Sequence, residues 1–207
     1  MKYFDNSFLK DGIKFIAGVD EAGRGPLAGP VVSASVIFDE STVISGVNDS
    51  KKLSEKEREF LFPEIISKSL SYSVALVSHG KIDAINILQA SLLSMKTAVS
   101  RLNKKPDLIL IDGNKIFTSE IPALAIIKGD SKSFSIAAAS IIAKVTRDRI
   151  MKRMDKYYPQ YLWSKNKGYG TKEHINAIKL YGESPFHRKT FLLKILSGKE
   201  NEKLHLE

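Results

Sequence analysis

The sequence predicts an α/β fold in which a mixed sheet is covered by helices. Short apolar runs alternate with longer segments of helical apolar spacing, and the first two apolar runs are close enough in the chain to pair with each other. The length of 207 residues fits one domain, or one domain with a modest C-terminal extension. Because the chain contains no cysteine, disulfide bonds, thiolate zinc sites and a cysteine nucleophile are excluded.

Five apolar runs are predicted to form the strands of this sheet. The first two, residues 14–21 and 30–38, flank a turn rich in glycine and proline, which predicts an antiparallel pair. The remaining strands are expected at residues 71–78, 107–112 and 121–127.

Helices are predicted between and after these strands. Ser54 and Glu57 have capping-box spacing, so a helix should cover residues 54–68, with Pro63 expected to kink or divide it. Apolar spacing predicts one helix over residues 83–102 and a long helix over 133–157. The small side chains of residues 137–140 would let the long helix lie close to the sheet. Two shorter helices are expected at 171–181 and 188–196.

The charge of the chain favours a polyanionic partner. Its formal net charge is +9, and residues 144–172 hold nine basic side chains against two acidic ones. Such an excess attracts nucleic acid, although a basic solvated face without a partner is the alternative. Charge therefore leaves open whether the chain is a nuclease or a binding module.

No segment is typical of a secretory signal or a membrane span. Charged residues interrupt any apolar stretch near the N-terminus, and the longest uncharged run, residues 25–38, is shorter than the roughly 18–20 residues a span needs. We therefore expect a soluble, cytoplasmic protein without a membrane partner, and a monomer.

Acidic residues follow three of the predicted strands. Asp20 and Glu21 end the first, Asp112 ends the fourth, and Asp130 follows the fifth. One such acid is usually a turn residue, but three positions in one sheet can converge at one edge. Converging carboxylates repel one another unless a cation neutralises them, and Mg²⁺ or Mn²⁺ suits an all-carboxylate site. Two such ions, roughly 3.5–4 Å apart, can support phosphodiester cleavage.

Residues 18–32, with the sequence GVDEAGRGPLAGPVV, closely resemble the first motif of the ribonuclease HII family. Further segments resemble the family's later motifs in the same order, at residues 48–53, 111–113, 128–132, 138–148 and 167–174. Together these matches span about residues 15–190, an extent that chance does not explain.

The resemblance implies a ribonuclease H-like fold with a five-stranded mixed sheet flanked by helices. Residues 1–157 would be the catalytic core, and residues 158–207 a helical extension packed on the core and contacting substrate. It also implies a catalytic, metal-binding set of four acids: Asp20, Glu21, Asp112 and Asp130. Of these, Asp130 lies on a strand-to-helix connection that could move.

The activity implied is that of an endonuclease that uses two metal ions, Mg²⁺ or Mn²⁺. It would hydrolyse the RNA strand of RNA–DNA hybrids and cut 5′ to single ribonucleotides in duplex DNA, leaving 3′-hydroxyl and 5′-phosphate ends. In this family a Gly-Arg-Gly turn and a later tyrosine read the ribonucleotide. The matching residues are Gly23, Arg24, Gly25 and Tyr169.

Other residues are candidates for less specific roles. Phosphate contacts are expected from Ser50, Lys51, Lys132, Arg147 and Lys172. His79 and His205 are expected at the surface, whereas the roles of His174 and His187 stay open.

Three alternatives remain at this point. A ribonuclease HIII-like enzyme would carry a large N-terminal domain, for which the 19 residues before Asp20 leave no room. A non-catalytic binder of RNA–DNA hybrids would be expected to lack one of the acids, and none is missing. A general two-metal DNA nuclease would not need a ribonucleotide.

Overall fold

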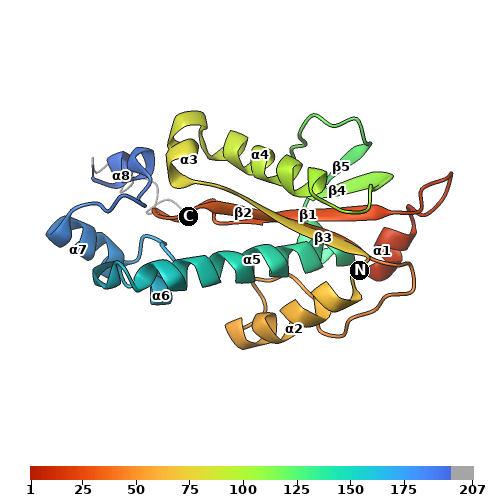
Figure 1. Ribbon diagram of the computed structural model, residues 1–207, viewed down its shortest axis with the longest axis horizontal. Coiled ribbons are helices and arrows are strands. Elements are labelled where there is room, and N and C mark those ends of the chain that lie inside the picture. Colours follow the sequence, from red (N-terminus) through yellow and green to blue (C-terminus); the bar gives the residue numbers. More distant parts are fainter. Residues whose placement is uncertain (197–207) are drawn as a thin grey trace, which may run out of the picture.

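A five-stranded sheet organises the fold in the computed structural model, which describes residues 1–196 (Figure 1). The strands are β1 (Ile16–Ala22), β2 (Val31–Ile37), β3 (Ser71–Val77), β4 (Leu108–Asp112) and β5 (Ala123–Ile126), in the spatial order β3-β2-β1-β4-β5. Antiparallel pairs join β1 to β2 and β2 to β3, and parallel pairs join β1 to β4 and β4 to β5. The predicted α/β fold, with its mixed sheet, is confirmed.

Helices lie on both faces of the sheet (Figure 1). The helices α3 (His79–Ile85) and α4 (Ile87–Ser100) cover one face, and α5 (Phe134–Asp155) with α2 (Glu55–Lys68) covers the other. The remaining elements are the helices α1 (Lys2–Asn6), α6 (Trp163–Asn166), α7 (Lys172–Tyr181) and α8 (Lys189–Leu196) and the 3-10 turns η1 (Gly129–Ser131) and η2 (Pro159–Tyr161). Within residues 1–196, no helix is long and apolar enough to cross a membrane.

Two helix predictions differ from the structure. The capping box at Ser54 and Glu57 is present, but α2 continues through Pro63 without division. The helix predicted over residues 83–102 is two helices, because Asn86 adopts a positive φ of 64°. The Asn86 side chain accepts a hydrogen bond from the Gln89 N–H and so begins α4.

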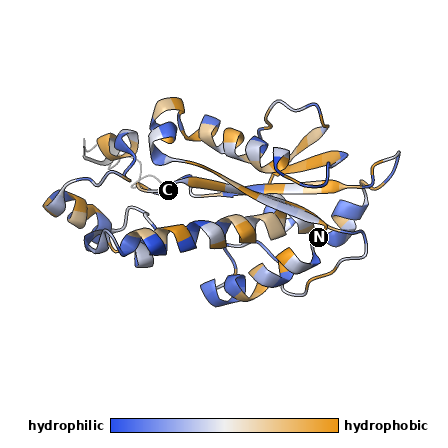
Figure 2. Ribbon diagram, in the orientation of Figure 1, coloured by the Kyte–Doolittle hydropathy of each residue, from blue (hydrophilic) through white to orange (hydrophobic). Residues whose placement is uncertain are grey.

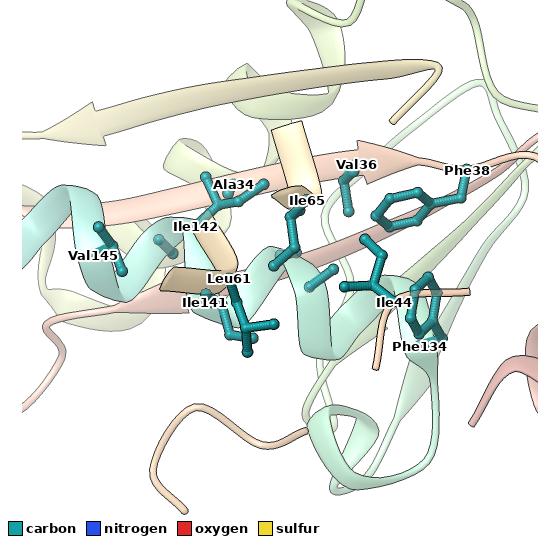
Figure 3. Packing of buried hydrophobic residues seen from close by; sticks show 13 residues of the cluster. Ala34, Val36, Phe38, Ile44, Leu61, Ile65, Phe134, Ile141, Ile142 and Val145 are labelled. Carbon is teal, nitrogen blue, oxygen red and sulfur yellow. The ribbon is translucent and has the colours of Figure 1, made fainter. Parts of the chain in front are cut away.

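The core on the α5 face is filled by aliphatic and aromatic side chains. Ala34 and Val36 of β2 meet Ile141, Ile142 and further residues of α5, while Leu61 and Ile65 of α2 close the cluster from outside (Figure 3). In Figure 2 the strand β4 is coloured mainly as hydrophobic, in keeping with its burial.

The helix α5 lies unusually close to β1. A Cβ at Gly18 would collide with the backbone of Ser135 and Ile136, so only glycine allows this approach. The small residues Ala137, Ala138 and Ala139 are fully buried at the same interface, as the sequence predicted. This contact fixes β1, and with it Asp20, against the helix that lines the later part of the site.

The chain beyond α5 packs onto the end of that helix and onto the turn that follows β1. Leu27 and Ala28 of the turn, Met151 of α5 and Tyr161 and Trp163 belong to one buried cluster, which residues of α7 and α8 complete. The C-terminal segment is thereby held beside the glycine-rich turn.

We predict that Gly18→Ala destabilises the protein by at least about 2 kcal/mol, because the added methyl group must push α5 away from β1. Urea denaturation followed by circular dichroism would measure the loss. Gly80→Ala is the matched control, since a Cβ there meets nothing within 4 Å. Equal urea midpoints for the wild type and Gly18→Ala would contradict the close approach.

Candidate active site

Three acids converge at one edge of the sheet. Asp20 lies on β1, Asp112 ends β4 and Asp130 lies in η1, just after β5. One carboxylate oxygen from each lies within 4.8 Å of the others. The register explains the first pair, because Val19 pairs with Ile111 across the parallel strands and the next residue on each strand is an acid.

Asp130 is held in place by its neighbour rather than left on a free connection. An Asp112 carboxylate oxygen accepts a hydrogen bond of 2.7 Å from the Gly129 N–H, at the start of η1. Lys128 adopts a left-handed φ of 55°, which turns the chain towards the acids. The sequence analysis placed Asp130 on a connection that could move, and in the structure the residue before it is hydrogen-bonded to Asp112.

Glu21 lies beside this cluster, not within the closest set. Its carboxylate is 3.4 Å from the Arg24 guanidinium, and its backbone N–H donates to Asp20 at 2.7 Å. The structure thus groups Asp130, rather than Glu21, with Asp20 and Asp112. Glu21 is nevertheless part of the same cavity wall.

The electrostatics of the cluster show a deficit of positive charge. Burial raises the pKa of Asp20 well above its usual value, and the charges of Glu21 and Asp112 raise it further. Burial, followed by the charge of Asp112, also raises the pKa of Asp130. These carboxylates offer only oxygen ligands, and their mutual repulsion opposes ionisation. A hard divalent cation would neutralise that repulsion, so the residues fit Mg²⁺ or Mn²⁺.

Lys51 supplies the cationic side chain nearest to Asp130, with its Nζ 3.4 Å from an Asp130 carboxylate oxygen. Burial would lower the pKa of Lys51, but the carboxylates of Asp130 and Asp20 outweigh it, so the pKa is raised. Arg58 holds this segment by donating to the Ser50 carbonyl at 2.8 Å.

Three of the four acids, Asp20, Glu21 and Asp112, line a cavity of about 350 Å³, whereas Asp130 is not part of its lining. Its lining brings together residues that the sequence analysis placed in separate motifs: Asp20, Glu21, Gly23, Arg24, Gly25, Ser50, Lys51, Asp112 and Tyr169. The ring of Tyr169 is 44% exposed, and a Cβ at Gly25 would lie 3.7 Å from it. The glycine-rich turn and the tyrosine are therefore neighbours in the wall of the cavity.

Lys144 also lines this cavity, and the sequence analysis did not select it. It forms an ion pair of 2.8 Å with Asp148, one turn further along α5. The signal that could have found it was its position in the motif at residues 138–148, on the helix face that carries Asp148. Lys132 and Lys172 are exposed but do not line the cavity.

Arg147 was expected to contact phosphate, but the structure places its side chain inside the protein. It is 1% exposed, and its guanidinium donates to the carbonyls of Ala28, Pro30 and Lys167. A side chain held in this way cannot reach a phosphate in the open cavity. Its role is to support the turn from behind, where a Cβ on Gly23 would collide with it.

The histidines are structural in the described part of the chain. His174 and His187 are buried and hydrogen-bonded to each other at 3.1 Å, which answers the open question about them. His79 is half-buried against Phe186, not fully at the surface as expected. His205 lies outside the described residues.

We predict that Asp20→Asn raises the Tm of the metal-free protein at pH 7 by about 2–6 °C. A carboxyl whose pKa is raised by folding contributes stability at low pH and loses it as the pH rises through the raised value, so the ionised Asp20 opposes folding at neutral pH. Thermal unfolding in EDTA would measure this difference, which should disappear in acid.

The same assay should show that Mg²⁺ or Mn²⁺ raises the Tm of the wild type more than that of Asp20→Asn. Asp39→Asn is the control, because hydrogen bonds from Ser41 lower the pKa of this exposed acid and its loss should not stabilise the protein. A lower Tm for Asp20→Asn than for the wild type in EDTA would contradict the predicted repulsion.

Comparisons with known proteins agree with this geometry. The sequence model of the family described as ribonuclease HII matches residues 17–194. The chain is 54% identical to a ribonuclease HII from Caldicellulosiruptor saccharolyticus, over 94% of this chain and 96% of that protein. It is 53% identical to a ribonuclease HII from Caldanaerobacter subterraneus subsp. tengcongensis, over 96% of this chain and 82% of that protein.

A solved structure shows the same fold. The crystal structure of ribonuclease H2 from Pyrococcus horikoshii OT3 superposes with a TM-score of 0.74 at 32% identity, covering 90% of this chain and all of that one. The family match and both relatives favour ribonuclease HII over ribonuclease HIII. The chain therefore belongs to the ribonuclease HII family and is an endoribonuclease of the ribonuclease H type.

Proposed function

We propose that this enzyme hydrolyses the RNA strand of RNA–DNA hybrids and also cuts 5′ to single ribonucleotides in duplex DNA, leaving 3′-hydroxyl and 5′-phosphate ends. The observation that carries this proposal is one cavity whose lining contains Asp20, Glu21 and Asp112 as well as the Gly23–Gly25 turn with Tyr169. The acids account for phosphodiester cleavage, and the turn beside them accounts for a dependence on the sugar.

Asp20, Asp112 and Asp130 would hold the Mg²⁺ or Mn²⁺ ions, with Glu21 at their edge. When bound, two such ions supply an activated water and stabilise the leaving oxygen. The chain's own contribution is to keep these carboxylates together despite their repulsion, through β1, β4 and the Asp112–Gly129 hydrogen bond.

The turn and Tyr169 would recognise the ribonucleotide. Gly23 has a φ of 101°, a conformation that L-side chains rarely adopt, and Gly25 leaves room for a sugar next to Tyr169. Backbone groups of such a turn can bind the 2′-hydroxyl, which distinguishes RNA from DNA. The exposed ring of Tyr169 can stack on the neighbouring deoxyribose.

The basic residues around the cavity would bind the phosphate backbone. Lys51 and Lys144 face the cavity, Ser50 lies in its wall, and Lys132 and Lys172 extend the positive surface beyond it. The partners proposed are thus RNA–DNA hybrids and ribonucleotide-containing duplex DNA. The C-terminal extension, residues 158–207, would contact this substrate from the side of Tyr169, in an enzyme that acts as a cytoplasmic monomer.

The first test compares three duplexes of one sequence: all DNA, DNA with one ribonucleotide, and an RNA–DNA hybrid. We expect cleavage of the last two with Mg²⁺ or Mn²⁺, no cleavage with EDTA, and a loss of about 10³-fold or more in Asp20→Asn. Cleavage of the all-DNA duplex would favour a general DNA nuclease. Binding without cleavage would favour a non-catalytic binder, and full activity of Asp20→Asn would refute the assigned site.

The second test concerns ribonucleotide selectivity. Tyr169→Ala should lower cleavage at a single ribonucleotide by about 5- to 100-fold, because one stacking contact is lost, whereas Tyr169→Phe should stay near the wild type. Arg24→Ala should also reduce selectivity, measured as the Kd for the all-DNA duplex divided by the Kd for the single-ribonucleotide duplex. Tyr157→Ala, at a more exposed tyrosine outside the cavity, is the control. Unchanged selectivity in both Tyr169→Ala and Arg24→Ala would exclude the assigned sensor.

A further inference from the structure

Arg188 lies fully buried behind the glycine-rich turn and binds it through three carbonyl groups. Its guanidinium donates to Gly23 at 2.6 Å, to Arg24 at 2.9 Å and to Gly29 at 3.0 Å. Arg147 holds the following residues in the same way, through the carbonyls of Ala28 and Pro30. Two buried cations thus take up the carbonyl side of the turn.

Neither arginine has a carboxylate within ion-pair distance in residues 1–196. Burial, followed by the charge of Arg147, lowers the pKa of Arg188 to about 9, whereas the charge of Asp83 acts in the opposite direction. Arg188 is therefore still charged at neutral pH, and the acceptors of its guanidinium are the three carbonyls of the turn. A buried cation strongly destabilises the folded state if its hydrogen bonds are lost. The three carbonyls are therefore held in the orientation in which they accept from Arg188.

Fixing the carbonyls also fixes the direction of the amides. Among the described residues, the N–H groups of Arg24 and Gly25 donate to no protein acceptor, and both residues are exposed at the cavity. A peptide unit whose carbonyl points towards Arg188 directs its N–H away from it. The turn therefore presents free, preoriented donors at the place proposed for the ribose.

A second network runs from the neighbouring residue, His187, to Tyr169. The Tyr169 carbonyl can only accept, so the His174 Nδ1 at 2.8 Å carries the proton. The His174 Nε2 then accepts from the Trp163 indole N–H at 3.0 Å and from the His187 Nε2 at 3.1 Å.

His187 completes this network with a defined tautomer. Its Nδ1 accepts from the Ser184 N–H at 2.8 Å, which leaves the proton on Nε2, as the contact with His174 requires. All these bonds are satisfied with both imidazoles neutral. The network ends on the backbone of Tyr169, so it sets where that ring emerges into the cavity.

We propose that Arg188 and His174 are positioning residues for ribonucleotide recognition: Arg188 orients the Gly23–Gly25 turn, and His174, held by its hydrogen bond with His187, orients Tyr169. This inference rests on the proposed function, because it concerns the same sensor. Backbone bonds join the two halves here as well, since Arg188 donates to the Leu27 carbonyl at 2.8 Å and Gly29 donates to the Phe186 carbonyl at 2.9 Å. The turn also contacts the tyrosine segment directly, because the Leu27 N–H donates to the Gly168 carbonyl at 2.8 Å, so the His187–Arg188 dipeptide reinforces a spacing that this backbone bond shares in setting.

The test measures discrimination, defined as the Kd for an all-DNA duplex divided by the Kd for the same duplex with one ribonucleotide. Binding is measured with Ca²⁺ in place of Mg²⁺ to limit cleavage. Arg188→Lys keeps the charge but cannot donate to three carbonyls, so discrimination should fall about 10-fold or more while the Kd for all-DNA duplex changes less than about 2-fold.

The tyrosine half is tested by two variants of His174. His174→Phe removes the donor to the Tyr169 carbonyl and should lower discrimination about 5-fold or more, whereas His174→Asn keeps a donor near the position of Nδ1 and should restore most of it. This pair gives an answer even where Arg188→Lys does not fold.

Val99→Ala is the stability control, because Val99 is a buried residue of α4 and belongs to a different core cluster from the residues of the turn. It should lower the Tm without changing discrimination. The inference is overturned where Arg188→Lys and His174→Phe lower the Tm like Val99→Ala but keep wild-type discrimination. A wild type that does not discriminate would instead overturn the proposed function, so the two failures are distinguishable.

Discussion

The close contact between β1 and α5 is the constraint on which the rest of the structure depends. Because Gly18 has no side chain, the first turn of α5 lies directly on the strand, and the helix then runs along the sheet beneath the turn that follows β1. Asp20 is two residues beyond the contact on the strand, and Lys144 and Arg147 are further along the helix. The close approach of β1 and α5 thus fixes the position of Asp20 relative to Lys144, which lines the cavity, and to Arg147, which holds the turn.

The carboxylates of the acid cluster repel one another, and the fold holds them together through the pairing of β1 with β4 and the Asp112–Gly129 hydrogen bond. Asp20 and Asp130 are buried near like charge, which raises both pKa values, and the nearby cations Lys51 and Arg24 compensate only in part. The remaining charge deficit is one that a hard divalent cation can neutralise. In the proposed function the basic exterior and the acidic centre have separate tasks: the lysines would attract the polyanion, and the carboxylates would act at one phosphodiester.

The sequence predicted the strands and the acids because both leave local signals. Aliphatic runs mark β1 and β4, and acids that end parallel neighbours must converge. The break at Asn86 was missed because a single residue with positive φ interrupts an apolar spacing that is otherwise continuous. The sequence could not show that Asp130, rather than Glu21, lies closest to Asp20 and Asp112. That placement involves the Gly129–Asp112 hydrogen bond, which no local pattern encodes.

The buried arginines that hold the glycine-rich turn could not be predicted from the sequence, because no local pattern encodes their contacts either. Arg188 meets Gly23 across 165 residues of sequence, and Arg147 meets Ala28 across 119, so both look like ordinary basic residues until the chain is folded. Arg147 was accordingly read as a phosphate contact, although its guanidinium faces inward.

Rigidity of the turn is a physical requirement of reading one hydroxyl group. A polar site rejects a substrate that lacks its hydrogen-bonding partner only when the unsatisfied site cannot relax and find another. A free glycine-rich turn would relax readily, because glycine has the largest backbone freedom. The carbonyl bonds of Arg188 remove that freedom on the side away from substrate, and the chain of bonds through His174 does the same for Tyr169. In the proposed function, the glycines would allow close approach to the ribose, and the buried C-terminal residues would make that approach selective.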